Sequence, residues 1–164
     1  MRGSMAAVLI GILFPSGGGA QDDPEKKSLE QATGLLKAVG KAEVTYFRVD
    51  PESEGKGKTD GLRGWVVLER KPLKEAKTVD EVRSILTDPK TYAPFGAKCF
   101  LPGMGFRFKG ETKSFDLVIC LKCSWIYAYA GADDTLTHSW ALSEAGVEKL
   151  LAFYKAQGAD AEKK

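Results

Sequence analysis

The chain of 164 residues contains no asparagine, one histidine (His138) and three cysteines (Cys99, Cys120 and Cys123). Without asparagine there is no acceptor for N-glycosylation, and turns must be built from Gly, Asp, Ser and Pro. A nucleophilic Cys–His pair would also lack an asparagine amide to orient its imidazole. The cysteines are therefore the main chemically suggestive feature of the sequence.

The chain also lacks a strong charge of either sign, with 24 Lys and Arg residues against 22 Asp and Glu residues. Its basic residues are scattered among acids, whereas a surface for nucleic acid or anionic lipid needs them clustered. No Gly-x-Ser-x-Gly or His-Glu-x-x-His motif occurs, and the P-loop-like glycine spacing of residues 105–110 is followed by Glu111-Thr112. We therefore expect no nucleic-acid partner and assign no catalytic residue.

The first twenty residues are typical of a secretory signal. Arg2 precedes an apolar run, residues 5–14, and small residues lead to Ala20. The apolar run is too short for a stable membrane span. We predict a signal peptide over residues 1–20, a polar leader over 21–27, a single domain over 28–158 and a charged tail over 159–164. The mature protein is then exported to the periplasm or the extracellular space.

The hydrophobic content of 43% is sufficient for one domain with a real core. Periodicity and capping signals predict helices after Ser28, after a capping box at Thr78–Glu81, and after Ser143. Alternating segments predict a hairpin formed by residues 43–49 and 62–70, with residues 51–61 as an exposed loop, and a short strand over 135–141. The expected fold is α+β, a mainly antiparallel sheet of four to five strands packed by two to three helices.

The most strongly patterned stretch is Phe115–Tyr129, whose odd-numbered residues are large and mostly apolar. This period of two predicts one half-buried strand. A turn at Gly110-Glu111 would pair it with the preceding segment and set Phe106 opposite Phe115, on the same buried face. The aromatic residues sharing this phase are predicted to fill the core, with a binding groove as the alternative: Trp65, Trp125, Tyr127, Tyr129 and Trp140.

The three cysteines surround this hairpin. An uninterrupted register places Cys99 near Cys120, whereas one residue inserted at Pro102-Gly103 turns it toward Cys123. An exported protein with such cysteines is expected to form one disulfide, and both pairings are compatible with the sequence. On the apolar face, Cys123 would be a natural buried and inert thiol.

A zinc site built from Cys99, Cys120, Cys123 and His138 is an alternative, because zinc accepts three thiolates and one imidazole. Against this site, Cys120 and Cys123 fall within a continuous strand pattern, and residues three apart on a strand point to opposite faces. A thioredoxin-like redox role would need the Cys-x-x-Cys pair at the start of a helix, and the surrounding pattern is strand. No cofactor is therefore assigned.

Two segments carry a resemblance: Cys99-Phe-Leu-Pro-Gly-Met-Gly-Phe-Arg-Phe108 and Phe115-Asp-Leu-Val-Ile-Cys-Leu-Lys-Cys-Ser124. They resemble a pattern in uncharacterised exported bacterial proteins, which implies a bacterial, exported, single-domain protein and no particular activity. The sequence predicts a non-catalytic binding or structural module of the envelope with a cysteine-stabilised hairpin and an envelope protein as its partner. The alternative is a thiol-redox or zinc-binding protein.

Overall fold

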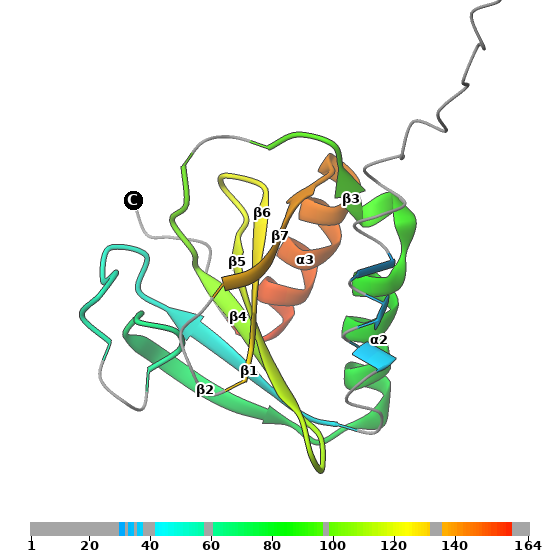
Figure 1. Cartoon of the computed structure of the whole chain (residues 1–164), viewed down its shortest axis with the longest axis horizontal. Coiled ribbons are helices and arrows are strands. Elements are labelled where there is room, and N and C mark those ends of the chain that lie inside the picture. The colour runs from blue at the N-terminus through cyan, green and yellow to red at the C-terminus, as the bar shows by residue number, and fades with distance from the viewer. Residues whose placement is uncertain are drawn as a thin grey trace, which may run out of the picture.

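The structure is a computed structural model that describes residues 30–31, 33–34, 36–37, 42–57, 61–96, 99–131 and 136–158. The predicted signal peptide, polar leader and charged tail lie outside these residues. The described part of the chain forms seven antiparallel strands with helices packed on them (Figure 1). The α+β class is thus confirmed, whereas the predicted sheet of four to five strands is too small.

The seven strands form one sheet in the order β2-β1-β4-β5-β6-β7-β3. Two strands account for the difference from the predicted number. The single strand expected over residues 115–129 is two strands, β5 and β6, and the two-residue strand β3 was not expected. The strand bounds are β1 (Glu43–Val49), β2 (Val67–Leu73), β3 (Tyr92–Ala93), β4 (Met104–Lys109), β5 (Ser114–Cys120), β6 (Trp125–Ala130) and β7 (Leu136–Leu142).

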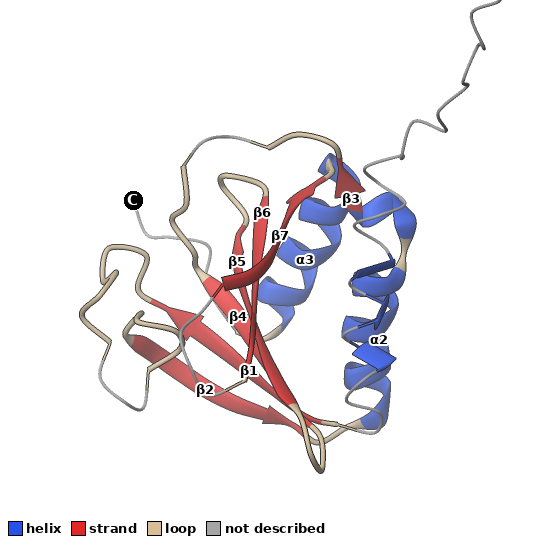
Figure 2. Cartoon of the chain, in the orientation of Figure 1, coloured by secondary structure: helices blue, strands red, loops and turns tan. Residues whose placement is uncertain are grey.

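Helices α2 (Ala76–Thr87) and α3 (Glu144–Ala156) lie on the same side of the sheet (Figure 2). Ser143 caps α3 as predicted, because its hydroxyl accepts the Gly146 N–H at 3.0 Å. The capping box predicted at Thr78–Glu81 is wrong: α2 begins earlier, after Glu75, so Thr78 lies inside the first turn. A single-turn 3₁₀ helix, η1 (Pro89–Thr91), follows α2.

The helix predicted after Ser28 is described only in part. The described residues between 30 and 37 are all helical, and Leu36 is buried in the main core. The side chain of Gln31 also accepts a hydrogen bond from the Trp140 indole at 3.0 Å. This segment therefore helps to cover the sheet, as the sequence predicts.

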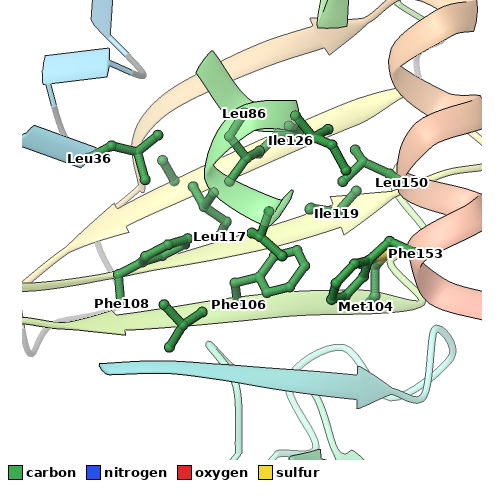
Figure 3. Close-up of a cluster of buried hydrophobic side chains, with 14 of the residues drawn as sticks. Leu36, Leu86, Met104, Phe106, Phe108, Leu117, Ile119, Ile126, Leu150 and Phe153 are labelled. Carbon is green, nitrogen blue, oxygen red and sulfur yellow. The ribbon is translucent and has the colours of Figure 1, made fainter. Parts of the chain in front are cut away.

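The sheet face beneath the helices, here called the inner face, carries the larger buried cluster. Leu86 of α2 and Leu150 and Phe153 of α3 meet side chains of the central strands there (Figure 3). The strand residues of this cluster include Met104, Phe106, Phe108, Phe115, Leu117, Ile119 and Ile126. Burial of these apolar groups is the main driving force for the fold.

The β4–β5 hairpin has the predicted faces but a different register. The connection spans four residues, Gly110–Lys113, closed by a hydrogen bond from the Gly110 N–H to the Lys113 carbonyl at 2.8 Å. Phe108 therefore faces Phe115, and Phe106 faces Leu117. The predicted pairing is displaced by two residues, and a displacement of two leaves every side chain on its predicted face.

The interruption of the expected long strand has larger consequences. The loop Leu121–Ser124 joins β5 to β6, and Ser124 adopts a positive φ of 56°. Cys120 then pairs with Trp125, and Val118 pairs with Tyr127. The odd-numbered residues of β5 face the helices, whereas those of β6 face away from them, because the loop reverses the phase.

The opposite sheet face, here called the outer face, is covered by loops. Strand β2 begins at Val67, later than predicted, because residues 62–65 form a tight turn with Arg63 and Gly64 at positive φ. Leu62 of this turn packs so closely on the sheet that a Cβ on Gly105 would collide with it. Ser53, within the loop predicted to be exposed, is buried and accepts the Val66 N–H at 2.8 Å.

Candidate functional site

Cys99 and Cys123 form a disulfide with a Cα–Cα distance of 5.7 Å. Cys99 lies on the segment that leads into β4. This segment follows the sheet, since Gly103 donates to the Ile119 carbonyl at 3.2 Å and accepts the Val49 N–H at 3.1 Å. Cys123 lies in the β5–β6 loop. Of the two pairings compatible with the sequence, the structure contains the one with Cys123.

Cys120 is the free cysteine and is fully buried at the end of β5. The prediction that Cys123 is the inert buried thiol is therefore wrong. The Cys120 sulfur accepts two backbone N–H groups, from Cys123 at 3.1 Å and from Leu101 at 3.3 Å. These donors belong to the two segments joined by the disulfide, so Cys120 lies between them.

The structure does not bring His138 to the cysteines. His138 pairs with Ala128, an inner-face residue, and stacks on Trp140 with ring centroids 5.8 Å apart. Cys120 lies on the outer face, in the row of Val118. Within the described part of the chain, no three His, Cys, Asp or Glu side chains are grouped to hold a metal. The set of Cys99, Cys120, Cys123 and His138 is therefore not assembled here.

An aromatic strip lies beside the cysteines on the outer face and consists of Phe100, Trp125 and Tyr127. Phe100 stacks on Tyr127 with ring centroids 3.7 Å apart and planes 8° apart. Trp125 meets Tyr127 edge to face at 6.5 Å. All three side chains are half-buried. The prediction that Trp125 and Tyr127 fill the core beneath the helices is wrong, because the β5–β6 loop reverses their phase.

The other three aromatic residues named with them have different surroundings. Trp140 lies in the inner core, as predicted. Trp65 and Tyr129 are buried in the outer cluster with Phe47, Val49, Leu62 and Val118. Trp65 also meets Phe100 edge to face at 5.7 Å. The indole N–H of Trp65 has no hydrogen-bond partner in the described structure.

Two exposed apolar side chains belong to residues that adjoin, along the chain, the strip or a residue in contact with it. Phe95 is 86% exposed and Leu101 is 44% exposed. Phe95 precedes Gly96, which lies against Trp125 so closely that a Cβ there would collide with the indole. Leu101 follows Phe100 and donates its N–H to Cys120. The sequence gives no signal for the exposure of Phe95 or Leu101, because an isolated apolar residue in a loop is equally compatible with burial.

A buried ion pair lies at the other end of the outer face. The Asp116 carboxylate, 1% exposed, accepts hydrogen bonds from Arg107 at 2.8 and 2.9 Å and from Arg63 at 2.6 Å. Arg63 also donates to the Gly131 carbonyl at 2.7 Å. Hydrogen bonding to Asp116 raises the pKa of Arg107 above its usual value. All oxygen–nitrogen distances are short. The three side chains join the turn of residues 62–65 to β4 and β5, so their role is structural.

No protein-family model, curated protein or solved structure matches the chain. Among the described residues, no helix has both the length and the apolar character needed to cross a membrane. The candidate site is therefore defined by geometry alone: the three cysteines and the adjoining aromatic strip. The sequence identified the cysteines, Trp125 and Tyr127, and missed Phe95, Phe100 and Leu101.

Proposed function

We propose that the protein is an exported, non-catalytic binding module that contacts an envelope protein through the aromatic strip and its neighbours Phe95 and Leu101. The observation that carries the proposal is the stack of Phe100 on Tyr127, together with the 86% exposed side chain of Phe95, whose neighbour Gly96 lies against Trp125. Aromatic side chains that are rigid and partly exposed are enriched in protein interfaces. The signal-like sequence of residues 1–20 and the disulfide support a location outside the cytoplasm.

The disulfide has a defined part in this proposal. Cys99 immediately precedes Phe100, so the bond to Cys123 fixes the segment that supplies one ring of the stack. A fixed segment loses less conformational entropy when a partner binds. The Cys99–Cys123 bond therefore presents the strip in a preorganised form.

Site-specific photo-crosslinking in the native cells tests the proposal. A photo-reactive phenylalanine analogue replaces Phe95 in one variant and Leu68, 53% exposed on the edge strand β2, in the control. We expect one discrete covalent adduct from position 95 and none from position 68. The adduct should weaken when Cys99→Ser is added. Equal adducts from both positions, or none from position 95, would contradict the proposal.

Zinc binding by the reduced protein is a second candidate. One observation favours it: Cys120 ends β5 and Cys123 lies in the following loop, so the objection that both occupy one strand no longer holds. Reduction of the disulfide would free Cys99 and Cys123, which with Cys120 give three thiols that suit zinc as thiolates, and His138 would not take part. Titration of reduced protein with zinc should then give one ion per chain, and Cys120→Ser should abolish tight binding. Absence of binding by the reduced wild-type protein would remove this candidate.

A further inference from the structure

The position of the free thiol beside the disulfide suggests chemistry that partner binding does not require. The Cys120 sulfur lies 3.1 Å from the backbone nitrogen of Cys123 and 3.3 Å from that of Leu101, two residues beyond Cys99. It is thus held between the two segments that the disulfide joins. A thiol in such a position is a candidate nucleophile toward the neighbouring bond.

We propose that Cys120 exchanges with the Cys99–Cys123 disulfide within the folded protein. When a local opening of the structure admits water to the buried Cys120 thiol, the thiol gives up its proton and the thiolate attacks the Sγ atom of Cys123. A Cys120–Cys123 bond forms as the Cys99–Cys123 bond breaks, and Cys99 leaves as a thiolate that takes a proton from water. Both before and after the step, two sulfur atoms are joined in a disulfide and one is a thiol, so no external oxidant or reductant is needed.

The loop geometry favours attack on Cys123. Cys120 and Cys123 are three residues apart across the tight β5–β6 connection. Residues three apart in a β-turn have Cα atoms less than about 7 Å apart, and disulfides usually join Cα atoms about 4.4–6.8 Å apart. The Cys120 sulfur already lies 3.1 Å from the Cys123 nitrogen, so the product joins two residues of one short connection that are close in the folded chain.

The environment of Cys99 favours its departure. Cys99 is exposed, whereas Cys120 and Cys123 are fully buried. Water can therefore solvate the departing Cys99 thiolate, and two amide donors stabilise the attacking Cys120 sulfur. Exchange moves the single reduced thiol from the interior to the surface, next to Phe100. The folded protein would then carry an accessible thiol at the edge of the aromatic strip, able to form a mixed disulfide with a partner.

Alkylation of the native protein tests the exchange. The full chain is exported to a bacterial periplasm, purified without reductant and treated with N-ethylmaleimide at neutral pH. Acid then stops further exchange by protonating thiolates, and non-reduced peptides are mapped by mass spectrometry. We expect the label on Cys99, in molecules that contain a Cys120–Cys123 disulfide.

Cys120→Ser is the matched control, because it retains the disulfide but removes the nucleophile. Labelling of Cys99 should fall by at least about tenfold if exchange requires the Cys120 thiolate. If this variant does not fold, the wild-type peptide map decides alone. Label on Cys120 beside an intact Cys99–Cys123 bond overturns the proposal. Label on Cys123 also overturns it. The proposal is equally overturned if the native protein takes up no label although the same protein is fully labelled in urea, or if its three thiols are found bound to zinc.

Discussion

The two faces of the sheet are stabilised differently. The inner face is covered by helices, and its buried cluster consists of aliphatic and aromatic side chains. The outer face is covered by loops and holds a smaller apolar cluster, the ion pair of Asp116, the disulfide and the buried thiol of Cys120. Non-directional burial stabilises the first face, whereas directional and covalent contacts attach loops to the second. The groups capable of chemistry or recognition therefore gather where loops cover the sheet.

Truncation of an inner aromatic residue should have the largest effect. Phe106 is fully buried and meets Phe153 at a ring centroid distance of 5.5 Å. Phe106→Ala should lower the free energy of unfolding by about 4 kcal/mol, because it leaves a cavity that the surroundings fill only partly. Urea denaturation measures this loss. Tyr127→Ala on the half-buried aromatic strip should cost less than half as much, and equal losses would contradict the distinction between the faces.

Removal of the buried carboxylate should have the next largest effect. Asp116→Asn leaves Arg63, whose side chain is 6% exposed, without its carboxylate partner. We expect a loss of about 3 kcal/mol in urea denaturation, because a buried charge without its partner is strongly destabilising. Glu69→Gln is the control, since it breaks an Arg48–Glu69 pair whose side chains are 38% and 35% exposed. That pair should contribute less than about 1 kcal/mol, and a similar loss in both variants would show that burial of Asp116 is unimportant.

Loss of the disulfide should destabilise the outer face by a comparable or smaller amount. The bond closes a loop with a sequence separation of 24 residues, for which chain-entropy arguments give about 3 kcal/mol. Cys99→Ser should therefore lower the urea midpoint, whereas Leu101→Ser, an exposed change two residues away, should not. Under reducing conditions, the wild-type protein and Cys99→Ser should therefore have the same urea midpoint. Stability unchanged by reduction would show that the covering segment is held without the bond.

The difference between the two faces also explains which parts of the fold the sequence could and could not predict. Strand β1, the cap and end of α3, and the inner orientation of Phe106 and Phe115 follow from periodicity and capping residues. The phase of Trp125 and Tyr127 was missed, because Leu121–Ser124 contains no Gly or Pro and its turn depends on a serine with φ 56°. The one available signal was length, since fifteen alternating residues exceed the usual strand of about 5–6.

The cysteine pairing could be predicted only in part for the same reason. The sequence predicted the three participating residues and one disulfide, and the choice of Cys123 depended on that unrecognised loop. The position of the free thiol depended on it too, because Cys120 is the last residue of β5 only if the strand ends there. Contacts across the outer face, such as Phe100 with Tyr127, join segments far apart in the chain. Local patterns carry no information about such pairs.

The smallest expected effect is an unchanged or slightly raised stability, and it concerns a polar atom on the inner face. Tyr46 is fully buried, and its hydroxyl has no hydrogen-bond partner in the described structure. Tyr46→Phe should therefore leave the unfolding free energy at pH 7 unchanged or raise it by about 1 kcal/mol, because it removes a desolvated polar group. Trp65, the outer-face counterpart with an unpartnered indole N–H, provides the comparison through Trp65→Phe, which should be destabilising because it also removes packing volume.

The pH dependence of the Tyr46 variant gives a second readout. Burial raises the pKa of Tyr46 above its usual value, and it does the same for Tyr92. The folded state therefore holds these protons more tightly than the unfolded state, so stability is fully present below the unfolded pKa of about 10 and is lost as the pH rises above it. Tyr46→Phe removes one of the two groups, and its unfolding free energy should fall less steeply between neutral and strongly alkaline pH. An alkaline loss identical to that of the wild-type protein would show that Tyr46 ionises without opening the inner core.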